Sequence, residues 1–124
     1  MNQDLVTPGP YGSLHLGRGT FGQALVAIKQ GQLVTRSGWN GKNMFIFQRP
    51  EDTLSIVTLV DHVKSLPQKV KDYYYFNSTA PFQDSKQTVK FTSYLCMKAI
   101  DDSIVNGWLA SQTDMLSEDW LILE

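Results

Sequence analysis

The sequence predicts a single α+β domain with a small, mainly antiparallel sheet and two to four short helices. Three observations indicate this class: an amphipathic helical pattern near the start, several short runs of β-forming residues joined by turn sequences, and the lack of an internal repeat. With 124 residues, of which 42% are hydrophobic, the chain is long enough for one modest core and too short for two ordinary domains. Residues 1–19 are rich in glycine and proline, so we expect a flexible arm there and the domain in residues 20–124.

The first helix is predicted between Thr20 and Gly31. Thr20 is a good N-cap residue, Gln23 completes a capping-box pattern, and Gly31 supplies a C-terminal stop. The runs QLVTRSG and MFIFQRP that follow are typical of strands. Between them, SGWNGKN is a polar turn in which Asn40-Gly41 is the expected hairpin signal.

The middle of the chain, DTLSIVTLVDHVKSLPQKVKDYYYF, allows two interpretations. Loosely spaced aliphatic residues from Leu54 to Val63 favour a helix that is interrupted before Pro67 and resumes as a short second helix through Lys71. The β-branched content of LSIVTLV favours a strand instead. NSTAPFQDSKQ, which follows, has the composition of a loop.

The last third predicts a hairpin, a short helix and a terminal strand. TVKFTSYLCMKAI alternates as a strand, DDS makes a turn, and IVNGW begins the return strand. Ser111-Gln-Thr-Asp114 gives a second helix cap, led by serine. WLILE is typical of a terminal strand, and we expect Trp120 to pack that strand.

Charge and cysteine content exclude several classes of function. The formal net charge of -1 and the pI near 6.1 argue against a general DNA, RNA or membrane-surface binder. A single cysteine, Cys96, excludes an internal disulfide and a multi-cysteine zinc site, and it fits a reducing, cytoplasmic setting. No apolar run approaches membrane-spanning length. We expect no metal and no cofactor.

Catalysis is the weaker hypothesis on sequence grounds. His15 falls in the arm, and His62 has no second histidine at ligand spacing. Cys96 is better explained as a buried small hydrophobe than as a nucleophile. The acidic residues form no recognisable acid/base or metal-binding pattern, and no phosphate-cradling glycine loop is present. We therefore predict no catalytic residue.

The aromatic residues indicate a function more clearly than the candidate catalytic groups do. Trp39 and Trp108 each lie beside glycine at a predicted strand or turn boundary, where a ring serves the core or an interface as readily as it stacks on a base. The run from Tyr73 to Phe76 is better explained as core, dimer interface and rim than as a base platform.

Polar neighbours of the tryptophans make a ligand site plausible. Ser111 at a helix start leaves first-turn N–H groups for an anion, and Arg36 is the most useful local cation for phosphate. Asp114 is expected to close the capping box or, alternatively, to accept hydrogen bonds from ribose hydroxyls or a base amino group. Asn40 either serves the turn conformation or binds a purine edge.

Two segments, TFGQALVAIKQGQLVTRSGWNGKNMFIF and YLCMKAIDDSIVNGWLASQTDMLSEDWLILE, resemble in order and spacing a family of small phage and prophage proteins. This family, long catalogued as a domain of unknown function, includes the second type of Thoeris anti-defence sponge. The resemblance implies a homotetramer in the host cytoplasm that sequesters cyclic ADP-ribose isomers in pockets between subunits. It further implies that some members hold CBASS cyclic oligonucleotides at separate sites.

The resemblance also implies which residues contact the ligand. Aromatic surface would come from Phe21, Trp39 and Trp108, and hydrogen bonds from Asn40, Thr113 and Asp114. Two alternatives stay open at this point: an enzyme that degrades the same messenger with Asp114 as acid or base, and a protein-binding module that inhibits a host defence protein.

Overall fold

The computed structural model describes residues 19–39, 43–78 and 87–123. The chain divides into two compact units, the first built from residues 1–49 and 94–124 and the second from residues 50–93. The second unit is thus inserted in the sequence between two strands of the first. The predicted α+β class, with a mainly antiparallel sheet and short helices, is confirmed.

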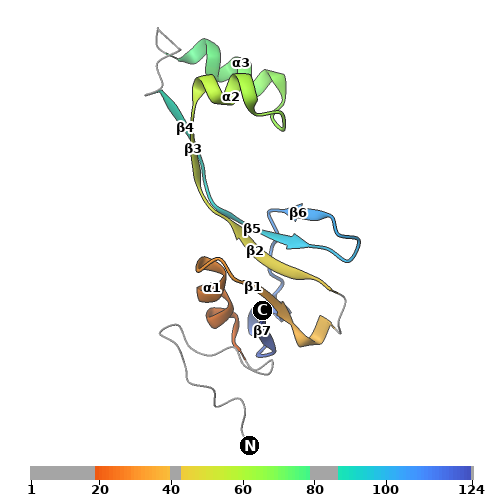
Figure 1. Cartoon of the computed structure of the whole chain (residues 1–124). Helices are drawn as coiled ribbons and strands as arrows, with labels where there is room; N and C mark the ends of the chain where they lie inside the picture. Colours follow the sequence, from red (N-terminus) through yellow and green to blue (C-terminus); the bar gives the residue numbers. More distant parts are fainter. Residues whose placement is uncertain (1–18, 40–42, 79–86, 124) are drawn as a thin grey trace, which may run out of the picture. The chain divides into compact units, whose positions relative to one another are not determined.

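The first unit is a five-stranded antiparallel sheet with the order β6-β5-β2-β1-β7. Its central strands are β1 (Leu33–Arg36), β2 (Phe45–Arg49) and β5 (Tyr94–Lys98). The edges are β6 (Ile104–Asn106) and β7 (Trp120–Leu123), so the terminal strand lies beside the first one (Figure 1). The connections include η2 (Ser37–Trp39) and α4 (Gln112–Leu116).

Helix α1 (Phe21–Lys29) packs against this sheet and forms its core. The predicted capping box is present, because the Thr20 hydroxyl accepts from Gln23 N at 3.1 Å and the Gln23 side chain accepts from Thr20 N at 2.9 Å. Gly31 follows with a φ of 87°, which a glycine adopts readily. The buried residues that α1 and the sheet share are Ala24, Ala27, Ile28, Val34, Ile46 and Trp120.

The second unit pairs β3 (Asp52–Ser55) with β4 (Thr88–Phe91) and adds α2 (Ile56–His62) and α3 (Gln68–Asn77). Both interpretations of the middle segment are therefore partly right. The strand ends at Ser55, whose hydroxyl accepts from Thr58 N at 3.1 Å and so starts the helix. The second helix does not stop at Lys71 but continues to Asn77 and includes the tyrosine run.

The prediction of one continuous strand in TVKFTSYLCMKAI is wrong. The segment forms β4 and β5, which belong to different sheets and are separated by Thr92 and Ser93. Period-two alternation continues through both strands, so the pattern does not reveal the change of partner. The hairpin between β5 and β6 is confirmed, with Asp102 at its turn at a φ of 70°.

Strands β1 and β2 are antiparallel neighbours, as the hairpin prediction requires, with Val34 opposite Ile46. Asn40-Gly41 and residues 1–18 of the predicted arm lie outside the described residues. Gly19 exchanges two backbone hydrogen bonds with Trp120, of 3.0 and 3.1 Å. Cys96 is buried in β5, as predicted, and His62 is exposed at the end of α2.

Candidate functional site

Four aromatic side chains meet in the first unit, and we call them the aromatic cluster: Phe21, Trp39, Trp108 and Trp120. The ring centroid of Trp120 lies 5.5 Å from those of Phe21 and Trp39 and 6.4 Å from that of Trp108. Both tryptophan contacts are edge-on, with interplanar angles of 76° and 74°. This is a favourable aromatic geometry. Trp120 thus brings together the other three aromatic residues, which were predicted as ligand contacts from separate parts of the sequence.

Each ring of the cluster sits at the boundary of an element. Phe21 opens α1, Trp39 ends η2, and Trp120 opens β7. Trp108 follows β6, and its backbone N–H donates a 2.8 Å hydrogen bond to Leu95 O. Trp120 is fully buried, whereas Trp39 and Trp108 are half-buried. The cluster therefore packs the core and still exposes part of two indoles.

Arg36 connects the cluster to two carboxylates. Its Nη1 donates to Asp114 Oδ1 at 2.7 Å, its Nε donates to Asp119 Oδ1 at 2.8 Å, and its Cζ lies 6.0 Å from the Trp39 ring centroid. The exposed fractions of these three charged side chains are 13% for Arg36, 13% for Asp114 and 26% for Asp119. The three groups together carry a net charge of about -1 at neutral pH, so the added phosphate contact predicted for Arg36 is disfavoured here.

The electrostatics hold both carboxylates in their charged form. Burial pushes the pKa of Asp114 upward, but hydrogen bonds from Ser111 and Arg36 outweigh it and leave the pKa below its usual value. The hydrogen bond from Arg36 lowers the pKa of Asp119 against the opposing effect of burial. Reciprocally, the hydrogen bond to Asp119 raises the pKa of Arg36. A stable ion triad results.

These shifts predict how the triad responds to acid. A carboxyl group whose pKa is lower in the folded state stabilises the fold above its unfolded pKa and loses that contribution as the pH falls through the folded value. We expect the urea midpoint of the native sequence to exceed that of Asp119→Asn by a constant amount from neutral pH to about pH 5, and the difference to shrink below about pH 4. Urea titrations across this range test it. A difference that vanished above pH 5 would contradict the assignment.

The second predicted helix cap is confirmed. Ser111 is the N-cap of α4, its hydroxyl accepts from Asp114 N at 3.0 Å, and Asp114 Oδ2 accepts from Ser111 N at 3.0 Å. Asp114 thus uses one oxygen for the cap and the other for Arg36. Its backbone carbonyl accepts the indole N–H of Trp120 at 2.9 Å. The start of α4 is therefore bonded to both Arg36 and the aromatic cluster.

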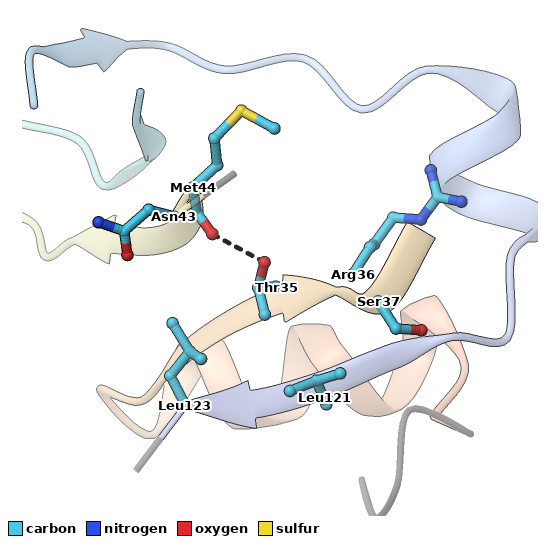
Figure 2. A pocket seen from close by; sticks show the side chains of 7 residues that line it. All are labelled: Thr35, Arg36, Ser37, Asn43, Met44, Leu121 and Leu123. Atoms are coloured by element: carbon cyan, nitrogen blue, oxygen red, sulfur yellow. Dashed lines mark hydrogen bonds between the residues drawn. The ribbon is translucent and has the colours of Figure 1, made fainter. Parts of the chain in front are cut away.

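A separate pocket of about 280 Å³ lies beside β1 and β7 (Figure 2). Thr35 lies opposite Leu121 in the strand pairing, whereas Arg36 lies opposite Trp120, so these pairs project from opposite faces of the sheet. Figure 2 shows the Arg36 side chain extending away from Leu121 and Leu123. Within the pocket wall, the Thr35 hydroxyl donates to Met44 O at 2.7 Å. The complete lining is Thr35, Arg36, Ser37, Asn43, Met44, Leu121 and Leu123.

The structure gathers most of the predicted site residues but not all of them. Thr113 is exposed in the first turn of α4, and Asn40 lies outside the described residues. Local sequence patterns indicate Trp120 only as a packing residue, and none of them identifies Asp119 as a site residue. Pairing β7 with β1 would have placed both residues beside Arg36, but no local pattern indicates that pairing.

The part of the chain described here brings no three His, Cys, Asp or Glu side chains into a metal-binding group. None of its helices has both the length and the apolar character needed to cross a membrane.

Comparison with known proteins relates the chain to one family. The model of the Thoeris anti-defense 2-like domain matches residues 19–123. The chain is also 36% identical over 104 residues to the protein named Thoeris anti-defense 2 of Bacillus phage SP01, an alignment that covers 84% of this chain and 93% of that relative.

Proposed function

The chain belongs to the Thoeris anti-defense 2-like family, and from this premise we propose that it binds and sequesters a cyclic ADP-ribose-type nucleotide without cleaving it. Sequestration in the host cytoplasm would keep the messenger from its receptor and so block Thoeris immunity. We assign this activity to residues 20–124. A sponge must compete at low messenger concentration, which calls for nanomolar affinity, about -12 kcal/mol.

The observation that carries the proposal is the pair of half-buried indoles beside a fully buried one. Trp39 and Trp108 each pack an edge contact with Trp120, so their orientation is fixed before a ligand arrives. A cyclised ADP-ribose presents an adenine face, ribose hydroxyls and a diphosphate. Stacking of a base on an indole contributes about 1–3 kcal/mol in nucleic-acid complexes, which makes the aromatic cluster suitable for the adenine.

The state of Asp114 favours binding over turnover. Efficient acid/base catalysis at neutral pH needs a group whose pKa lies near that pH. Asp114 instead has a lowered pKa, and its two oxygens accept from Ser111 N and Arg36 Nη1. These contacts support a positioning and hydrogen-bonding role for this carboxylate rather than proton transfer to the messenger.

We propose further that the ligand site is completed by a second subunit within a homotetramer. Ligand pockets usually enclose most of the ligand, whereas Trp39 and Trp108 offer a nucleotide only the part of each indole that the core leaves exposed. The first unit also exposes large apolar side chains, among them Leu109 at 88% and Leu116 at 79%. Such side chains near Trp108 and α4 suit a subunit contact. Separate pockets for CBASS cyclic oligonucleotides belong to the same proposal.

Native mass spectrometry with a glycocyclic ADP-ribose isomer released by a bacterial TIR-domain enzyme tests the function. We expect a tetramer that carries the nucleotide and, after denaturation, chromatography that returns it intact. A chemically altered product would establish an enzyme instead. Capture of a host protein by a chain that binds no nucleotide would establish a protein-binding inhibitor. A CBASS cyclic oligonucleotide, added second, tests whether the two ligands share a site.

A further inference from the structure

Asp119 makes hydrogen bonds to three consecutive residues at the start of the turn that ends in Trp39. Its Oδ1 accepts from Arg36 Nε at 2.8 Å, its backbone carbonyl accepts from Ser37 N at 3.0 Å, and its Oδ2 accepts from Gly38 N at 2.8 Å. These partners lie between 81 and 83 positions away in the sequence. The end of the chain therefore fixes the backbone that precedes Trp39.

The turn depends on this external support. It consists of one short 3-10 segment, Ser37–Trp39, and such segments have weaker hydrogen-bond geometry than an α-helix. Trp39 also makes an edge-on contact with Trp120, the residue that directly follows Asp119. Two adjacent residues therefore constrain Trp39: Asp119 through the backbone before it, and Trp120 through direct ring contact.

The Asp119 carboxylate leaves no room for a side chain at Gly38. A Cβ atom at this position would lie 2.6 Å from Asp119 Oδ2 and 3.2 Å from Arg36 Nη2. The backbone of Gly38 does not have the positive φ that would by itself demand glycine. The need for glycine comes from the close approach of Asp119, whose carboxylate cannot retreat without lengthening its bonds to Gly38 and Arg36.

We propose that Asp119 is a positioning residue that sets the orientation of the Trp39 ring, with Arg36 as its cationic partner and Gly38 as the position that admits its carboxylate. The inference rests on the proposed nucleotide site, which it deepens. Asp119 acts through Trp39 and needs no contact with the ligand. A stacking ring held in place before binding loses less freedom when the ligand arrives, so loosening it weakens binding.

Two variants disturb the same contact in different ways. Asp119→Asn removes the charge and one acceptor, whereas Gly38→Ala keeps both charged partners and displaces the carboxylate. Asp102→Asn is the matched control, because it removes an ion pair of similar length, 2.7 Å to Lys98, at an exposed turn where asparagine tolerates the positive φ. Calorimetric titration with the glycocyclic ADP-ribose isomer should show about tenfold weaker binding for the two test variants and none of this loss for the control.

Near-ultraviolet circular dichroism of the unliganded chain provides a second measurement. Edge-on tryptophan pairs give signals that depend on the angle between the rings, so both test variants should change the spectrum while the far-ultraviolet spectrum stays the same. In a Trp39→Phe background, Asp119→Asn should cause much less of this change and less of the affinity loss, because the residue through which it acts is altered. Fully additive effects would indicate that Asp119 only supports the fold.

The two measurements separate this inference from the proposed function. Native protein that bound no nucleotide would overturn the function, while the spectra would still decide whether Asp119 orients Trp39. Native protein that bound tightly, with Asp119→Asn and Gly38→Ala equally tight and spectrally unchanged, would overturn the positioning role alone.

Discussion

Replacing Trp120 with alanine is expected to lower the free energy of unfolding by about 3–5 kcal/mol, a large part of the roughly 5–15 kcal/mol that stabilises a typical domain. Trp120 is completely buried in the core that α1 shares with the sheet. Its ring contacts Phe21, Trp39 and Trp108, so alanine would leave a cavity bordered by three aromatic residues. The indole N–H bond to Asp114 O would also be lost.

Two controls make this result specific. Trp120→Phe keeps a ring and loses the 2.9 Å indole hydrogen bond, so it should be destabilised by much less than the alanine variant. Ile100→Ala removes a side chain that is 59% exposed in the turn after β5 and should change the stability by no more than about 0.5 kcal/mol. Urea unfolding followed by far-ultraviolet circular dichroism measures all three without relying on tryptophan fluorescence. A loss below about 1 kcal/mol for Trp120→Ala would mean that the cluster is not a core element.

The helices whose signals are local were predictable from the sequence. Both capping boxes, Thr20 with Gln23 and Ser111 with Asp114, are formed as the four-residue patterns predict. The strands around Val34 and Ile46 follow from their β-forming residues. In each case the decisive interaction joins residues a few positions apart or follows from residue type.

Features that depend on distant pairing were not predictable. The break at Thr92 and Ser93 separates two strands that share one alternating pattern, so the change from one sheet to the other has no local signal. Likewise, the hydrogen bond between Arg36 and Asp119 spans 83 positions. Without the β1–β7 pairing, Arg36 looks like a solvated cation available to phosphate, although in the fold two carboxylates compensate it.

Replacing Arg36 with methionine is expected to destabilise the chain at neutral pH by about 2–3 kcal/mol, because two mostly shielded carboxylates would lose their shared cation. Methionine retains much of the aliphatic stem, so the loss reports chiefly on the guanidinium. Arg36→Lys keeps the charge but has no planar guanidinium to join Asp114 and Asp119. Its free energy of unfolding should therefore lie between those of the native protein and Arg36→Met. Arg49→Met is the matched control, since Arg49 is exposed at the end of β2, over the Tyr94 ring.

The pH dependence of Arg36→Met provides the decisive signature, because its sign is opposite to that of the native ion triad. Without the guanidinium, burial and mutual repulsion are opposed by the remaining hydrogen bonds from Ser111 and Gly38, and we expect them to raise the pKa values of Asp114 and Asp119 above their unfolded values. A carboxyl group with a raised folded pKa destabilises the fold at high pH, and this penalty is relieved as the pH falls through that pKa. The deficit of Arg36→Met relative to native protein should therefore narrow as the pH falls from about 7 toward 4. Urea midpoints at several pH values test this, and a constant deficit over that range would show that the carboxylates move apart into solvent once Arg36 is gone.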